Sequence, residues 1–479
     1  MKKLISILLL LAMMLAVLVA CNDDKGGEET TPANDDNGVA GGETNEETES
    51  SILPPKDLGG YVFRSLGHPD WEGIVYEEDD EIDDTSILVK SKLERDAEVK
   101  DMLNVQLVDV PQQSIISYVL TDAMLPYSTY DMGRPWGTDS LAPLITQDII
   151  LDVGTIPHLR TEKPWYQQQA LEEYSIMGKL YFVSAFYPEQ PGSSPLWFNK
   201  DMMLELNLEL PYDTILAGDW TIEKMSEYCA AAYKDLGSSG RDENDYFGYA
   251  GHSRSICYFY QGMDGRTTGR DENGAVTPVI SDEKVDAIYS KLIDFYNQSW
   301  AWHNTDLNAG VHSSSHRMFY DGNALFIYWV TATLHAEEID AFERGLAILP
   351  KYDLDQETYR CPSGGAYFFP SNIEDVDALG YIFEYLCEAS YRIVYPAVIQ
   401  EAIDFEQLTD EGSIKVQKLV DQSLFCDILK SCDPSEGLLA SCGYVWYCIS
   451  NNTTPSAAAS SVKSVVERQF QEFFYGKQE

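Results

Sequence analysis

GYVFRS at residues 60–65 predicts a first β-strand, and VQLVDV at residues 105–110 alternates side chains like a second strand. Between them a helical pattern begins at Thr85 and ends at Asn104. Strand, helix and strand in this order predict a βαβ unit. Such units build sheets whose strands run parallel.

Predicted strands and predicted helices continue to alternate along the chain. Tyr130 to Met132 predicts the end of a third strand, and GRPWG at residues 133–137 is a turn-rich loop after it. Further strands are expected at 178–183, 196–199, 324–330 and 345–349. Further helices are expected after the N-cap Thr221, from Asp282 to Tyr296, from Asp375 to Tyr395, and from Val462 to Phe474. The third of these helices is expected to end at Pro396. The chain is therefore expected to be an α/β protein with ligand-binding loops at the carboxyl ends of its strands.

The N-terminus has the pattern of a bacterial lipoprotein signal. Two lysines precede an apolar run over residues 4–19, and LVAC at residues 18–21 follows the Leu-small-small-Cys pattern of a lipobox. We expect residues 1–20 to be cleaved and Cys21 to carry lipid, which would hold the protein on the extracytoplasmic face of the cell membrane by this anchor alone. The alternative is a plain secretory peptide followed by a chance cysteine.

Composition narrows the range of partners. Residues 21–57 contain mainly Asp, Glu, Gly, Thr, Asn and Ser, which predicts a disordered acidic linker. The formal net charge of the chain is −45, so nucleic acid and anionic lipid are unexpected ligands.

Eight cysteines follow Cys21: Cys229, Cys257, Cys361, Cys387, Cys426, Cys432, Cys442 and Cys448. An exported protein permits disulfides, and the closeness of the last four makes one or two bridges near the C-terminus plausible. Buried thiols are the alternative.

Eight short motifs occur in one order between Gly60 and Gln469. They are Arg95 to Val105, Tyr130 to Asp152, GKLY at 178–181, FNK at 198–200, PY at 211–212, GDWT at 218–221, FYDGNALF at 319–326 and ILP at 348–350. This order resembles the extracellular solute-binding proteins of ABC importers, in particular the carbohydrate-binding group that includes maltose-binding protein.

The resemblance implies a two-lobed, hinged, periplasmic-binding-protein-like fold of type II with a ligand cleft between the lobes. It also implies a monomer that binds carbohydrate, performs no chemistry, needs no cofactor or metal, and delivers its ligand to permease subunits. We assign residues 58–185 and 328–365 to the first lobe and residues 186–327 and 366–479 to the second. The hinge crossings are then expected near 184–195, 326–331 and 362–369.

In such folds the loops after the first and third strands face one cleft. The first loop contains His68, Asp70 and Trp71, and the second contains Arg134 and Trp136. Sugars have apolar ring faces and polar rims, so they need aromatic platforms beside side chains that hydrogen-bond hydroxyls. In the resembling family, the loop that matches Arg134 and Trp136 also contacts the sugar.

Additional contacts are expected from the hinge and the second lobe. These are Tyr187, Tyr328, Trp329 and Tyr367 at the hinge crossings, and His252 and Tyr258 on a second-lobe loop. Packing in the core is the alternative for any single aromatic residue, Tyr258 included.

Other functions remain as alternatives. GHSRS at residues 251–255 nearly matches a hydrolase nucleophile elbow, but Ser255 occupies the second glycine position. His312 and His316, with His303 nearby, could hold a metal, although a polar, exposed helix face is the simpler interpretation. The acidic run from Glu77 to Asp84 could hold calcium, although a solvated loop is the simpler interpretation. Peptide capture is the main rival within the same fold.

Overall fold

The computed structural model describes residues 52–69, 86–135, 140–187, 195–237, 241–252, 255–304, 314–328, 342–363, 365–404, 408, 410–429 and 453–476. Within them, β1 (Tyr61–Gly67) pairs in parallel with β2 (Val105–Pro111) and with β3 (Met132–Gly133), giving the sheet order β2-β1-β3. The helix α2 (Ile87–Leu103) joins the first two strands and ends at Asn104, which has a left-handed φ of 49°. The predicted βαβ unit is confirmed.

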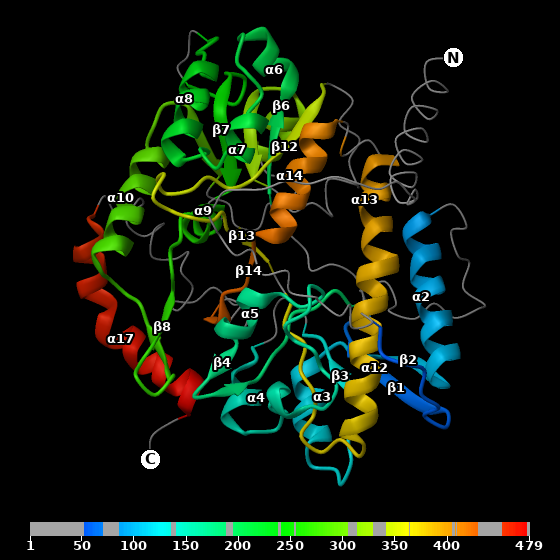
Figure 1. Cartoon of the computed structure of the whole chain (residues 1–479). Coiled ribbons are helices and arrows are strands. Elements are labelled where there is room, and N and C mark those ends of the chain that lie inside the picture. Colours follow the sequence, from blue (N-terminus) through cyan, green and yellow to red (C-terminus); the bar gives the residue numbers. More distant parts are fainter. Residues whose placement is uncertain are drawn as a thin grey trace, which may run out of the picture. The chain divides into compact units, whose positions relative to one another are not determined.

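This sheet organises the first lobe. Phe63 of β1 and Val99 of α2 share a core with α12 (Val376–Ala389), and α2 and α12 lie side by side (Figure 1). A neighbouring core joins Leu66 to residues of the C-terminal helix α17 (Pro455–Tyr475). The smaller elements here are α3 (Ile115–Asp122), α4 (Ala142–Thr146), η1 (Val153–Thr155), α5 (Gln168–Glu173), β4 (Ser175–Ile176) and β5 (Lys179–Leu180).

A five-stranded sheet organises the second lobe in the order β10-β7-β11-β6-β12. Its strands are β6 (Leu196–Asn199), β7 (Phe247–His252), β10 (Ala301–Asn304), β11 (Ala324–Tyr328) and β12 (Arg344–Ala347). Around it lie α6 (Lys200–Glu205), α7 (Tyr212–Leu216), α8 (Ile222–Ala232), α9 (Ser255–Gly262), α10 (Glu283–Tyr296), α11 (Ser314–Tyr320) and α14 (Glu411–Gln422). Thr221 and Asp282 accept hydrogen bonds from backbone amides in the first turns of α8 and α10, so these two predicted helix starts are confirmed.

The structure divides the chain between the lobes differently from the sequence-based assignment. Residues 328–365 were expected in the first lobe, but β12 pairs with β6 in the second-lobe sheet. Residues 366–479 were expected in the second lobe, but α12 packs in the first-lobe core. There the fully buried Glu384 of α12 accepts hydrogen bonds from Trp165 (3.2 Å) and Tyr166 (2.7 Å).

Two crossings between the lobes lie together. The short strands β13 (Cys361–Pro362) and β14 (Leu424–Phe425) pair in parallel. Each begins in the second-lobe core and is followed by residues of the first-lobe cores, Ala366 in one case and Cys426 in the other. The predicted crossing at 362–369 is therefore close to the observed one. Of the crossing predicted at 326–331, residues 326–328 lie in β11 of the second-lobe sheet, and residues 329–331 lie outside the described residues.

Two further differences concern helices and cysteines. The helix expected to end at Pro396 continues through a π-helical turn, Ser390–Val394, into α13 (Tyr395–Asp404). Pro396 directly follows this irregular turn, in which the amide of Tyr395 donates to the carbonyl of Ser390, so the proline coincides with a local change of helix type and does not end the helix. Cys229 and Cys387 are free, buried thiols, and Cys257 is disulfide-bonded. Cys432, Cys442 and Cys448, where bridges were predicted, lie outside the described residues. No helix among the described residues combines the length and apolar character that a membrane span requires.

Candidate functional site

The first lobe brings two of the predicted ligand-binding residues to one edge of its sheet. His68 directly follows β1, and Arg134 directly follows β3. Leu66 lies opposite Gly133 in the parallel pair, and the backbone amide of Arg134 donates to the carbonyl of Leu66 at 2.9 Å. Both residues are partly exposed, so this edge presents an imidazole and a guanidinium at the carboxyl ends of two neighbouring strands.

The second lobe brings another two together. Tyr328 is the last residue of β11, and its ring stacks on Tyr258 of α9 with centroids 4.6 Å apart and an angle of 24° between the planes. Tyr328 is only 6% exposed, whereas Tyr258 is half-buried. The inner ring therefore supports the outer one, which presents an aromatic surface of the kind that packs on a sugar.

Tyr187 and Tyr367 occupy a different environment from the one predicted. Tyr187 is fully buried in the first-lobe core, with the guanidinium of Arg95 4.9 Å from its ring centroid, and burial raises the pKa of its hydroxyl well above the ordinary value. Tyr367 is 5% exposed and pairs through its backbone with Val183. In this conformation both pack the first lobe and are not exposed for ligand contact.

The remaining predicted positions are only partly described. His252 is the last residue of β7, at the carboxyl end of that strand. Asp70, Trp71, Trp136, Trp329 and the lipidation site Cys21 lie outside the described residues.

A polar depression at the junction of the lobes was missed by sequence reasoning. Its volume is about 570 Å³, and it is lined by Gln169, Asp264, Lys284, Tyr352, Asp353, Asp355, Gln356, Glu357, Thr358 and Arg360. Gln169 belongs to α5 of the first lobe and Lys284 to α10 of the second, and the others follow or precede second-lobe elements. No sequence signal could have found this site because its residues come from four separate segments.

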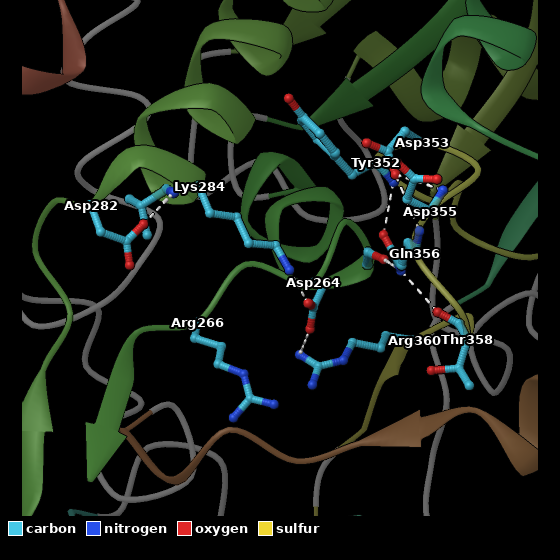
Figure 2. Close-up of polar contacts among 12 residues, drawn as sticks. Asp264, Arg266, Asp282, Lys284, Tyr352, Asp353, Asp355, Gln356, Thr358 and Arg360 are labelled. Atoms are coloured by element: carbon cyan, nitrogen blue, oxygen red, sulfur yellow. Dashed lines mark hydrogen bonds and ion pairs between the residues drawn. The ribbon is translucent and has the colours of Figure 1, made fainter. Parts of the chain in front are cut away.

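Asp264 pairs with two basic side chains of this depression. Figure 2 shows the side chains of Lys284 and Arg360 converging on its carboxylate, and Arg360 Nη1 lies 2.9 Å from Asp264 Oδ1. Gln356 is held by donating to the carbonyls of Gly262 and Thr358, both at 2.9 Å. Most of these polar groups therefore bond one another, and they stabilise the loop before β13.

The metal-site alternative gains no support from the part of the chain that the structure describes. No group of three or more His, Cys, Asp or Glu side chains there is arranged to hold a metal ion. His316 is 2% exposed, and burial, followed by the positive charge of Arg241, lowers the pKa of His303. His312 lies outside the described residues.

Comparison by sequence and comparison by structure give different results for this chain. No protein-family model and no curated protein matches the sequence. Among solved structures, a cyclo/maltodextrin-binding protein complexed with maltotetraose superimposes with a TM-score of 0.58 at 11% identity, over 86% of this chain and 97% of that one. The fold is that of the maltodextrin-binding proteins.

Two further structures have the same maltodextrin-binding-protein fold. A sugar transporter from Rhizobium etli, in an open conformation, superimposes with a TM-score of 0.57 at 14% identity, over 85% of this chain and 99% of that one. The sugar-binding protein MalE from Xanthomonas citri gives 0.57 at 13% identity, over 85% and 96%. The predicted two-lobed α/β fold of the solute-binding type is thus confirmed.

Proposed function

We propose that this protein is a substrate-binding protein of an ABC importer that captures an extracellular carbohydrate. The observation that carries the proposal is the maltodextrin-binding-protein fold with polar and aromatic side chains at the carboxyl ends of strands in both lobes. His68 and Arg134 supply groups that hydrogen-bond hydroxyls, and the Tyr258–Tyr328 stack supplies an apolar platform. Trp71 and Trp136 remain proposed contacts from the first lobe.

Binding in this proposal is a change of population and involves no bond making. The ligand contacts both lobes at once only when they close, so it stabilises the closed form by its greater affinity for that form. The permease would then recognise the closed form. Rotation would take place where the chain crosses between the lobes, as in the paired strands β13 and β14.

The structural neighbours named above are binding proteins, which favours a non-enzymatic role for this chain as well. A thermal-shift panel of glycans and peptides on the mature chain would test the proposal, because a ligand that binds only the folded state raises the melting temperature. We expect oligosaccharides to raise it and peptides to leave it unchanged. A rise in melting temperature with peptides alone would show that the ligand is a peptide and not a carbohydrate. Turnover of chromogenic glycosides or esters would show that the protein is an enzyme.

We further propose that Cys21 carries the lipid anchor, on the basis of the lipobox. The Cys21→Ala variant should fold normally and leave the membrane fraction for the aqueous phase in a detergent-partition assay. Recovery of the variant with the membranes would contradict this assignment.

A further inference from the structure

A hairpin from the second lobe reaches the first lobe beside Glu173. Its strands β8 (Thr268–Arg270) and β9 (Val276–Pro278) pair antiparallel and lie between α9 and α10 in the chain. At its turn, the carbonyl of Gly274 accepts a hydrogen bond from the amide of Met177 at 2.9 Å. Arg270 donates to the carbonyl of Glu173 at 2.6 Å and to that of Ser175 at 3.2 Å.

Val276 joins the hairpin to the first lobe by packing as well as by hydrogen bonds. Its side chain is 1% exposed and shares a core cluster with Tyr174, Phe182 and Phe470. The residues on either side of the hairpin, Tyr260 of α9 and Val285 of α10, belong to the second-lobe core. A rotation of one lobe against the other must therefore either move this contact or strain it.

Glu173, at the end of α5, is 9% exposed and is surrounded by charges from several elements. Arg266, just before the hairpin, places Nη1 3.6 Å from Glu173 Oε1. Arg270 of β8 and Arg360 of the segment before β13 also favour the ionised carboxylate, and Asp427 opposes it.

The neighbours of Glu173 are themselves engaged. Asp427 is 4% exposed and accepts hydrogen bonds from Thr267 (2.6 Å) and Gln261 (3.3 Å). Arg360 pairs with Asp264, which Lys284 of α10 also contacts (Figure 2). Arg360 therefore also neutralises Asp264, and the second buried carboxylate near Glu173 is that of Asp427.

The balance of these effects favours the neutral acid. Burial, followed by the negative charge of Asp427, raises the pKa of Glu173 to about 7, although Arg270, Arg266 and Arg360 act in the opposite direction. A carboxyl group whose pKa lies near neutrality at a contact between two lobes has the properties that a pH-dependent switch requires.

We propose that Glu173 is a proton-controlled latch between the two lobes, which holds the hairpin against α5 when protonated and loosens this contact when ionised. Control of lobe closure on a ligand by this latch rests on the proposed function. The pH dependence of the contact itself is a property of the unliganded chain.

The direction in which pH changes the hairpin contact follows from proton linkage. With the contact formed, Glu173 has a pKa of about 7, and when the contact separates it returns toward 4.5, the ordinary value. The formed contact therefore binds more protons in this window. The equilibrium constant for separation should rise by up to roughly tenfold per pH unit between about 4.5 and 7, and should level off above.

Distance measurements between spin labels on the unliganded full chain would test the latch. Ala97 of α2 and Lys418 of α14 are exposed and lie in different lobes, so labels attached there through unnatural amino acids report the lobe arrangement and leave the native cysteines intact. From pH 5 to pH 7.5 we expect the separated population to rise several-fold in the wild type. In Glu173→Gln, which mimics the protonated acid, it should stay low throughout, whereas Glu172→Gln, at the exposed neighbouring residue, should respond like the wild type.

A pH response that is equal in Glu173→Gln and the wild type, or absent from the wild type, would overturn the latch. Carboxyl-carbon NMR of Glu173 gives a second measurement, since an ordinary pKa near 4.5 would also overturn it. Neither experiment contains a sugar. Failure here is therefore distinguishable from failure of the proposed carbohydrate binding, which the ligand panel decides.

Discussion

Tyr258 stacks on Tyr328 with ring centroids 4.6 Å apart, and this contact joins the start of a second-lobe helix to the carboxyl end of a second-lobe strand. A second tyrosine stack in the same lobe has similar geometry, since Tyr260 and Tyr289 lie 4.8 Å apart with 9° between their planes. The two stacks differ in exposure: Tyr260 and Tyr289 are both buried, but Tyr258 is only half-buried. Only the first stack can offer a ring to a ligand.

This difference predicts a separation of binding from stability. Tyr258→Ala should weaken binding of the glycan identified by the panel by about 2 kcal/mol, or roughly 30-fold, because it removes a platform from the interface. Tyr260→Ala is the matched control, and it should lower the melting temperature while leaving the affinity nearly unchanged. Calorimetry and thermal unfolding of both variants check this. Equal affinity losses in the two variants would show that Tyr258 acts only through packing.

Arg134 should contribute to binding without contributing much to stability. Its backbone is fixed to Leu66, but its position after a short edge strand leaves the side chain partly exposed. Arg134→Ala should leave ligand hydroxyls unpaired and cost an affinity factor of roughly 10 or more. Trp136→Ala should have a comparable effect by removing an aromatic platform. Wild-type affinity in both variants would place the carbohydrate elsewhere in the cleft.

The buried ion pair of α2 should be essential for the stability of the first lobe. Arg95 Nη2 lies 2.7 Å from Asp96 Oδ1, both side chains are almost fully buried, and Arg95 also donates to Ser390. Arg95→Ala should cost about 3–5 kcal/mol of unfolding free energy because it leaves a buried carboxylate unpaired. Asp96 already has a raised pKa from burial, so the variant should regain stability as the pH falls and Asp96 takes up a proton.

Chemical denaturation at several pH values measures this effect. Lys415→Ala is the control, since Lys415 forms an exposed pair with Glu411 on α14 and its loss should leave the denaturation midpoint unchanged. A small, pH-independent loss in Arg95→Ala would mean that the surrounding first-lobe core relaxes to compensate.

The thiols of Cys229 and Cys387 should be inert in the folded protein. Burial raises the pKa of both well above the ordinary value, and Glu384 raises that of Cys387 further. Since the thiolate is the reactive form, iodoacetamide at pH 8 should label neither in native protein but should label both in denaturant, as peptide mass spectrometry would show. Rapid labelling of the native chain would indicate local opening around these residues.

Local pattern in the sequence determined the elements and their order. The strand at Tyr61, the helix that ends at Asn104 and the caps at Thr221 and Asp282 all follow from neighbouring residues, because periodicity, capping and left-handed turns are short-range effects. The two-lobed fold was expected because the order of motifs resembles that of the solute-binding proteins. In addition, the alternation of strands and helices placed the carboxyl ends of the first and third strands at one edge, and His68 and Arg134 directly follow these two paired strands.

Membership of the lobes was decided by tertiary structure. Whether β12 pairs with β6, or whether α12 covers the first-lobe core, depends on contacts between residues far apart in the chain, and no local pattern contains them. The same reason explains why Tyr187 is buried against Arg95 and why Glu173 lies between charges from the hairpin, the segment before β13 and the segment after β14. Burial and neighbouring charge set the chemistry of a side chain, and both are properties of the assembled fold.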